Sequence, residues 1–286
     1  MSKPTLHPVA IGLHWRDGLA LLIPVLAIIV ASTGAFSPHR AHAQDMVQSL
    51  DLTSDDFTKT DMSRAEIEAA LAKLTDGETL DLSGKRLNGL DLSGLDLTRT
   101  RLQATRINNA NFKGAKFDAV VLDAAWALKS DFTGASFVGA SMFQTQMQDA
   151  KLDGANFSNA MVGADMSRAS LIKARFDDAM LAPDLTNQSM GLMRGVLKSA
   201  NLEGASFKGA NLTRSAFEFA TLTGADFSGA NLTGAELAGA NLTGANVTGA
   251  NFEGADVEQT KLMQLKGQES AKGFDKLKNS EKALRD

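Results

Sequence analysis

Residues 225–254 read ADFSG ANLTG AELAG ANLTG ANVTG ANFEG when the chain is divided at every fifth residue. Each group has an apolar residue at its centre, such as Leu232 or Phe252, and an alanine two positions earlier, such as Ala230. An α-helix turns by about 100° per residue, so a period of five would spread these apolar residues around the whole helix. A straight strand is also excluded, because an odd period would send alternate groups to opposite faces. The chain must therefore turn once in every group.

Glycine ends many of these groups, as at Gly229 and Gly234. Glycine suits a turn because it adopts backbone angles that a Cβ atom forbids. Short straight pieces that are joined by regular turns, each burying two side chains, predict an all-β solenoid.

The groups of five extend over residues 80–264 and slip twice. Residues 160–163 form a group of four, one residue too few, and residues 184–189 form a group of six, one residue too many. Groups such as ADFSG at 225–229 and ANLTG at 230–234 resemble the pentapeptide-repeat family, whose consensus is A-(D/N)-L-x-x. The resemblance implies a right-handed quadrilateral β-helix with four groups per coil, and hence about nine coils in this chain.

Residues 1–43 have the features of a secretory signal peptide. Basic residues such as Lys3 precede an apolar run at 19–36, and residues 41–43 read AHA. This order of features predicts cleavage after Ala43. The alternative is an uncleaved membrane anchor, because the apolar run is just long enough to span a bilayer. Both interpretations place the repeats outside the cytoplasm, in a periplasmic or secreted protein or in one anchored in the membrane and facing outward.

Residues 44–79 are acidic and contain a short helix. Ser63 and Glu66 have the S-x-x-E spacing of a capping box, and apolar residues at helical spacing follow, which predicts a helix at about 63–75. An open solenoid end needs a cover, so this helix is expected to form the N-terminal cap. A helix that binds a partner is the alternative.

The tail at 265–286 is charged and carries few large apolar residues, so it is expected to be a loosely docked helix or a solvated end. An exposed coil edge could also pair two copies end to end in a homodimer, unless the tail covers it.

The residue inventory argues against an enzyme. All four histidines precede Gln44, and cysteine and tyrosine are absent. Beyond the signal segment there is therefore no imidazole for acid-base chemistry, no thiol nucleophile and no His or Cys metal ligand. An enzyme with a site made only of carboxylates is one alternative, with pairs such as Asp91 and Asp96 as candidates. We expect no catalytic residue, no cofactor and no metal.

A second alternative comes from the resemblance. Some pentapeptide-repeat proteins resemble duplex DNA and act on DNA gyrase or topoisomerase. Such mimicry needs a strongly acidic face, because DNA carries about one charge per 1.7 Å of its axis. Residues 80–264 contain 19 acidic and 17 basic residues, a net charge of −2. The charge and the predicted export together favour a protein partner in the cell envelope over a DNA mimic, and no nucleic acid is expected as a partner.

Side chains twenty residues apart are expected to stack on one face of the solenoid, and one such column contains Trp126. An aromatic residue and apolar groups beside arginines are typical of protein interfaces. In the alternative interpretation, Trp126 exchanges roles with Ala127 and turns inward. The candidate partner-binding patch comprises Arg86, Arg101, Arg106, Val121, Trp126, Leu128, Phe143 and Met161. The sequence thus predicts an exported, non-enzymatic protein that acts as a binding or structural scaffold.

Overall fold

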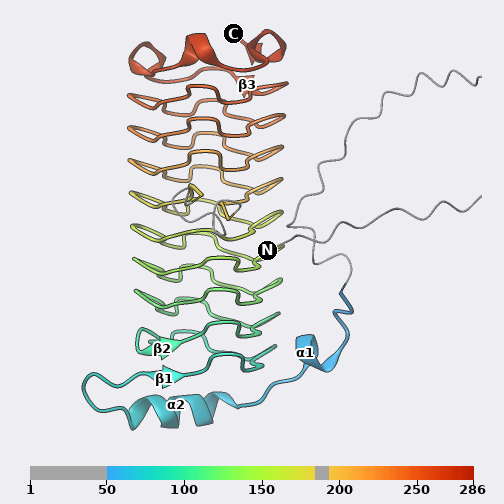
Figure 1. Cartoon of the computed structure of the whole chain (residues 1–286), viewed down its shortest axis with the longest axis vertical. Helices are drawn as coiled ribbons and strands as arrows, with labels where there is room; N and C mark the ends of the chain where they lie inside the picture. Colours follow the sequence, from blue (N-terminus) through green and yellow to red (C-terminus); the bar gives the residue numbers. More distant parts are fainter. Residues whose placement is uncertain (1–49, 184–192) are drawn as a thin grey trace, which may run out of the picture. The chain divides into compact units, whose positions relative to one another are not determined.

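The computed structural model of the chain describes residues 50–183 and 193–286. The described residues belong to one unit, Gln44–Asp286. Within it, successive coils stack on one another (Figure 1). The predicted signal peptide with its apolar run, and the irregular group at 184–189, lie outside the described residues. No helix within the described residues is long and apolar enough to cross a membrane.

Parallel ladders of hydrogen bonds join the coils. Trp126 bridges Arg106 in one neighbouring coil and Gln146 in the other, each twenty residues away. The Trp126 amide donates to the Thr105 carbonyl at 2.8 Å, and the Trp126 carbonyl accepts from the Ile107 amide at 2.7 Å. The predicted stacking of residues twenty apart is therefore confirmed at these positions.

Continuous strands are short, because the chain turns soon after each bridging residue. β1 (Leu80–Asp81) pairs in parallel with β2 (Thr100–Arg101), and β3 (Lys261–Leu262) pairs in parallel with β4 (Leu284–Arg285). The other coil contacts are isolated bridges and do not form a closed sheet among the described residues.

The turns have positive φ angles at regular intervals of five residues. Gly229 has φ +69° and Gly234 has φ +64°, as expected for the glycines that end each group. Other residues take the same angle where glycine is absent, including Ala104 at +53° and Lys129 at +58°. The left-handed angle is costly for these side chains. The ladders on both sides of each turn hold them there.

The core consists of the alanine and the central apolar residue of each group. Ala230 and Leu232 are almost completely buried, as the sequence predicts. Phenylalanine rings stack from coil to coil: Phe112 lies over Phe132 with ring centroids 5.0 Å apart and 4° between the ring planes. Burying one such side chain contributes about 1.5 to 3 kcal/mol.

The ladder shows where the repeat slips. Ser141 pairs with Met161, twenty residues on, but Gln146 pairs with Asp165, only nineteen residues on. This confirms the short group at 160–163. Asp165 then pairs with Val196, which is 31 residues on.

The step from Asp165 to Val196 is therefore eleven residues longer than one coil of twenty residues. The Gly195 amide donates to the Leu181 carbonyl at 2.8 Å, so Leu181 and Gly195 are neighbours in the stack. The core stays continuous across this point, because Leu181 and Leu197 are both fully buried.

Two helices precede the coils. α2 spans Arg64–Ala72, within the range of about 63–75 expected from the sequence. α1 spans Asp55–Thr58 and was not predicted. The predicted capping box is present: the Ser63 amide donates to Glu66 Oε2 at 2.7 Å, and the Glu66 amide donates to Ser63 Oγ at 3.3 Å. Ile67 of α2 is fully buried in the same hydrophobic core as the coils.

The tail at 265–286 continues the stack, in contrast to the expected loosely docked or solvated end. Three 3-10 helices, η2 (Gln268–Ser270), η3 (Phe274–Lys276) and η4 (Ser280–Lys282), alternate with residues that bridge the coil below. Lys272 bridges Asn251, and the Phe274 ring lies 5.1 Å from the ring of Phe252.

Candidate protein-binding face

One side of the stack carries the ladder of Arg86, Arg106, Trp126 and Gln146. Trp126 is partly buried on the outside of its coil, whereas Ala127 is fully buried in the core. Trp126 therefore does not exchange roles with Ala127, and the inward-turning alternative is wrong. We call this ladder, together with the side chains of Asn88, Asn108, Leu128 and Gln148 beside it, the Trp126 face.

The segment before the coils lies against the Trp126 face. The ring of Phe57 in α1 meets the ring of Trp126 edge-on, with centroids 5.4 Å apart and 80° between the planes. The Asn88 side-chain amide donates to the carbonyls of Asp56 at 3.1 Å and Lys59 at 2.7 Å. Figure 1 shows α1 beside the first coils. The face is thus partly covered by the chain itself.

Opposite charges join the segment to the ladder. Arg86 donates to Asp61 Oδ1 from Nη2 at 2.6 Å and from Nε at 3.0 Å, and its backbone amide donates to Asp61 Oδ2 at 2.8 Å. These side-chain and backbone hydrogen bonds lower the pKa of Asp61, and the bonds to Asp61 raise the pKa of Arg86. Arg106 Nη2 lies 3.3 Å from Asp56 Oδ2, a longer and weaker contact.

A row of four buried side chains runs beside the ladder. Asn88 Oδ1 accepts from the Asn108 backbone and side-chain amides, and Asn108 Oδ1 accepts from the Leu128 amide at 2.9 Å. The exposed fractions of these residues and of Gln148 lie between 2% and 6%. The equivalent residue Lys113 on another side of the coils is exposed. The coils therefore do not bury this position on every side.

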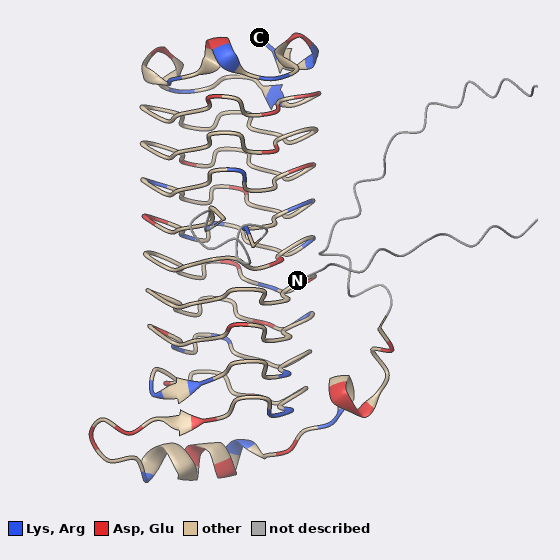
Figure 2. Cartoon of the chain, in the orientation of Figure 1, with Lys and Arg blue, Asp and Glu red and all other residues tan. Residues whose placement is uncertain are grey.

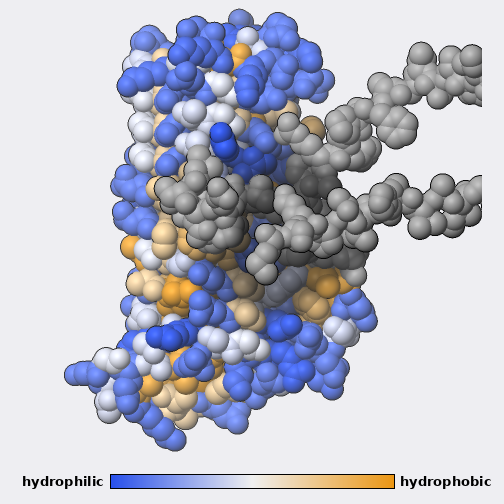
Figure 3. All heavy atoms as spheres, viewed as in Figure 1, coloured by the Kyte–Doolittle hydropathy of each residue, from blue (hydrophilic) through white to orange (hydrophobic). Residues whose placement is uncertain are grey.

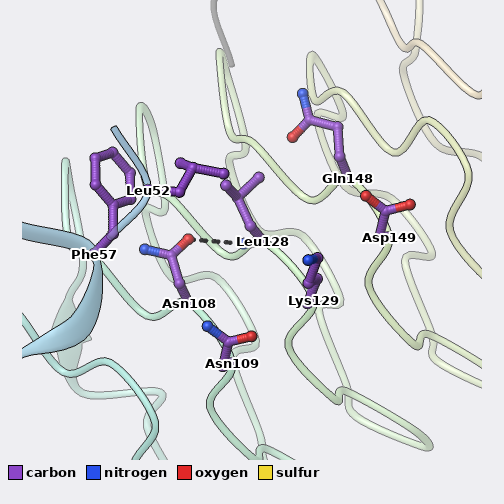
Figure 4. Close-up of a pocket in the computed structure, with 8 residues that line it drawn as sticks. All are labelled: Leu52, Phe57, Asn108, Asn109, Leu128, Lys129, Gln148 and Asp149. Atoms are coloured by element: carbon purple, nitrogen blue, oxygen red, sulfur yellow. Dashed lines mark hydrogen bonds between the residues drawn. The ribbon is translucent and has the colours of Figure 1, made fainter. Parts of the chain in front are cut away.

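A pocket of about 150 Å³ lies between the segment and the coils (Figure 4). Leu52 and Phe57 come from the segment, and Leu128 and Gln148 come from the coils. The remaining lining residues are Asn108, Asn109, Lys129 and Asp149.

The rest of the predicted patch forms a second ladder. Val121 bridges Arg101 and Ser141, and Ser141 bridges Met161. Arg101 is exposed, Val121 is partly exposed, and Met161 is 43% exposed. We call these residues the Met161 ladder. Partly exposed Phe143 packs closely over Gly163, where a Cβ atom would lie only 2.9 Å from the Phe143 ring.

Sequence reasoning missed several residues of this site, among them Asp56, Phe57, Asp61, Asn88, Asn108 and Gln148. The signal for the first three was available, because an acidic segment with Phe57 as its aromatic residue precedes a column that begins with two arginines. No pattern in the repeats marked Gln148, whose burial depends on what packs against its coil.

The acidic pair Asp91 and Asp96, considered as a catalytic candidate, forms hydrogen bonds within its own turns. Asp91 accepts hydrogen bonds from Ser93 and Asp96 accepts them from Thr98, and these bonds lower the pKa of both carboxyls. Both carboxylates are therefore ionised and engaged with their own turns. Within residues 50–183 and 193–286, no group of three or more His, Cys, Asp or Glu residues is placed to hold a metal ion.

Acidic and basic residues are mixed over the coils, whereas hydrophobic surface is distributed unevenly. Figure 2 shows acidic and basic residues interspersed along the coils, without a continuous acidic stripe in that view of the described residues. In Figure 3, hydrophobic surface gathers over the coils of the lower half, and the C-terminal end is mostly hydrophilic. The exposed large apolar residues of the coils include Met161, Met180 and Phe219.

Parallel ladders, a turn every five residues and an alanine-leucine core define a solenoid of five-residue repeats. The chain belongs to the pentapeptide-repeat family: the family model for pentapeptide repeats matches it in eight copies, at residues 81–123, 129–159, 196–229 and 225–264. Members of this family form right-handed quadrilateral β-helices, as the resemblance implied.

Solved structures of similar proteins belong to the same class. HetL, a pentapeptide repeat protein involved in heterocyst differentiation regulation from the cyanobacterium Nostoc sp. strain PCC 7120, is 25% identical over 78% of this chain and 94% of its own, with a TM-score of 0.43. QnrB1, a plasmid-mediated fluoroquinolone resistance protein, is 18% identical over 70% of this chain and 91% of its own, with a TM-score of 0.38. A comparison with curated proteins found no match.

Proposed function

We propose that the chain is a non-enzymatic scaffold that binds a partner protein. The observation that carries this proposal is the alignment of Arg86, Arg106 and Trp126 in one outward ladder over a fully packed core. Arginine and tryptophan are over-represented among the residues that dominate protein interfaces. Because the described core is filled by apolar side chains, binding depends on the outward residues.

The Met161 ladder extends the proposed binding surface. Met161 and Met180 bridge one another in adjacent coils and are 43% and 46% exposed. Methionine provides apolar contact area that adapts to different partners. Together with Val121 and Phe143, these residues add apolar area next to the charged Trp126 face.

We also propose that α2 caps the first coil. Ile67 fills space at the end of the core, and the Arg64 guanidinium donates to the carbonyls of Asp91 at 3.1 Å and Ser93 at 3.2 Å. These contacts cover an edge that would otherwise be available for pairing with another chain.

Export is part of the proposal and rests on residues 1–43. The intact mass and the cell fraction of the native protein test it. A species that begins at Gln44 outside the cytoplasm is expected, and full-length protein in the membrane would favour an anchor at 19–36 that faces outward. A soluble full-length cytoplasmic protein would overturn export and favour the gyrase-directed DNA mimic.

Crosslinking in envelope extracts tests the binding function. The wild type and the Trp126→Ala and Phe219→Ala variants are compared, where Phe219→Ala removes an exposed aromatic residue outside the proposed surface. A protein captured by the wild type and by Phe219→Ala, but lost with Trp126→Ala, supports the proposal. With the purified partner, Trp126→Ala is expected to weaken binding by about tenfold or more. Capture that is indifferent to Trp126 and to Met161→Asp would contradict it.

The carboxylate-only enzyme remains an alternative with its own test. Turnover of a phosphate ester, peptide or glycan by the pure protein, lost on substitution of a single carboxylate, would support it. The bonding of Asp91 and Asp96 within their turns argues for a structural role at those two positions.

A further inference from the structure

We propose that residues 51–59 are a displaceable occupant of the Trp126 face, and that the face binds a partner segment of the same chemistry. That segment carries an aromatic side chain directly preceded by carboxylates, as Phe57 follows Asp55 and Asp56. The proposal rests on the proposed function and deepens it, because it names the chemistry of the partner.

The segment is held loosely compared with the helix that follows it. Every residue of α1 is at least partly exposed, and Ser54 makes no capping bond through its side chain within the described residues. In contrast, α2 has a complete capping box and buries Ile67. Few contacts and an exposed backbone are typical of a segment that opens locally while the rest of the structure stays folded.

Contacts at Thr60 and Asp61 limit how much of the segment can leave the coils. Thr60 bridges Leu87 in an antiparallel contact, and the Asp61 amide donates to the Arg86 carbonyl at 2.7 Å. Residues before Thr60 can therefore leave the face while Asp61 and α2 remain in place.

The segment leaves a buried donor without a partner. Arg106 Nε is buried and has no hydrogen-bond acceptor among the described residues, and Nη2 reaches Asp56 only at 3.3 Å. A carboxylate placed in line with the guanidinium would accept from Nε and from Nη2 together. A partner segment with a better placed carboxylate would thus satisfy Arg106 more completely than Asp56 does.

The pocket also holds a buried acceptor without a partner. Gln148 is 4% exposed, and its Nε2 donates to Gln146 Oε1 and to Asp165 Oδ2, both at 2.9 Å. The carboxylate of Asp165 can only accept when ionised, so the amide nitrogen must face it and Oε1 must face away. Within the described part of the chain, Gln148 Oε1 has no hydrogen-bond donor.

The two unpaired atoms lie on the face that already carries an acidic and aromatic segment. Figure 4 shows the amide end of Gln148 turned toward the side of the pocket where Leu128 and Leu52 lie. The pocket of about 150 Å³ has room for one more side chain. A buried polar atom without a partner costs free energy, so a segment that supplies an acceptor to Arg106 and a donor to Gln148 displaces residues 51–59.

The test uses the full-length chain and a labelled peptide with the sequence of residues 50–62. Asp56→Ala together with Phe57→Ala empties the face, and peptide binding is followed by fluorescence anisotropy. The tethered segment competes at an effective concentration in the millimolar range. The emptied variant is therefore expected to bind the peptide at least about tenfold more tightly than the wild type.

Matched variants show whether the peptide uses the proposed face. Adding Trp126→Ala or Arg106→Gln to the emptied variant is expected to reduce binding at least about tenfold, whereas adding Phe219→Ala leaves it unchanged. Melting temperatures are measured for every variant, and Arg106→Gln replaces Trp126→Ala if the latter does not fold. A peptide with lysine in place of its aspartates is expected not to bind.

Two outcomes overturn the proposal: no peptide binding to the emptied variant, or binding that neither Trp126→Ala nor Arg106→Gln weakens. If the peptide does not bind the emptied variant while envelope crosslinking still depends on Trp126, the scaffold function stands and only the acidic, aromatic chemistry of the partner is wrong. If the peptide binds while crosslinking is indifferent to Trp126, the face recognises the chain's own segment and the proposed partner is wrong.

Discussion

The rings of Phe137 and Phe157 lie parallel in adjacent coils, with centroids 4.8 Å apart and 4° between their planes. The same stack continues through Phe176 to Phe207, although the nineteen-residue spacing and the eleven-residue excess fall along this part of the chain. The packing of the core is thus continuous across the places where the spacing between coils is irregular. Surface departures from the repeat can therefore carry function at little cost to the fold.

Phe137→Ala is expected to destabilise the protein by about 3 to 5 kcal/mol, because it opens a cavity between two stacked rings. Phe137 is fully buried, and its ring packs against Phe117 as well as Phe157. The free energy of unfolding in denaturant measures the effect. Phe219→Ala is the control: this ring is 68% exposed, so its loss is expected to cost less than about 0.5 kcal/mol. Equal effects of the two substitutions would contradict the described core.

Gly273→Ala is expected to destabilise the C-terminal end more than Gly244→Ala does. Both glycines have positive φ, +73° and +70°, so both substitutions strain the backbone. A Cβ atom at Gly273 would lie 2.6 Å from the Cα atom of Glu253, whereas one at Gly244 meets nothing within 4 Å. The clash is with backbone and adds about 1 to 3 kcal/mol. Hydrogen exchange of residues 265–286 measures it, and similar exchange in both variants would argue against the docked tail.

The solenoid could be predicted from the sequence because its cause is local. A period of five excludes both regular elements, and the alternation around Leu232 assigns the core directly. The helix at Ser63 was equally clear, since a capping box and helical spacing are both short-range signals.

Docking of the Phe57 segment could not be derived in the same way. Docking depends on which of the four outward sides of the coils the non-repeating segment packs against. The five-residue period is the same on all four sides, so it does not distinguish them. The eleven extra residues between Asp165 and Val196 could not be derived from the period either. Leu192 lies five residues before Leu197 and so keeps the five-residue spacing, but the ladder passes directly from Asp165 to Val196.

Phe57→Ala is expected to shift the emission of Trp126 to longer wavelength, because the tryptophan loses its edge-on contact and becomes more exposed to water. The chain has two tryptophans, so Trp15→Phe leaves Trp126 as the only reporter. The melting temperature should fall by only a few degrees, since such a pair contributes about 0.5 to 1.5 kcal/mol beyond its buried area. Phe219→Ala in the same background is expected to leave the emission unchanged. An unchanged spectrum with Phe57→Ala would mean that α1 does not rest on Trp126 in solution.

Acid is expected to release the N-terminal segment from the coils. Hydrogen bonds from the side chain and backbone of Arg86 lower the pKa of Asp61, and bonds from the backbone and side chain of Ser63 lower the pKa of Glu66. The unfolded values are about 3.9 for Asp and 4.3 for Glu. A lowered folded pKa gives stability that is present above the unfolded value and is lost as the pH falls through the folded value.

Release should therefore begin below about pH 4 and be followed by the emission of Trp126 in the Trp15→Phe background. Other charged groups near Asp61 also contribute, because Lys85 and Arg86 favour its ionised form and Asp56 favours the charged form of Arg86. Asp61→Asn is the matched variant: it keeps the shape of the side chain but removes the charge that titrates. It is expected to loosen the segment already at pH 7 and to flatten the acid transition. A transition that is equally steep with asparagine at this position would show that Asp61 does not hold the segment through its charge.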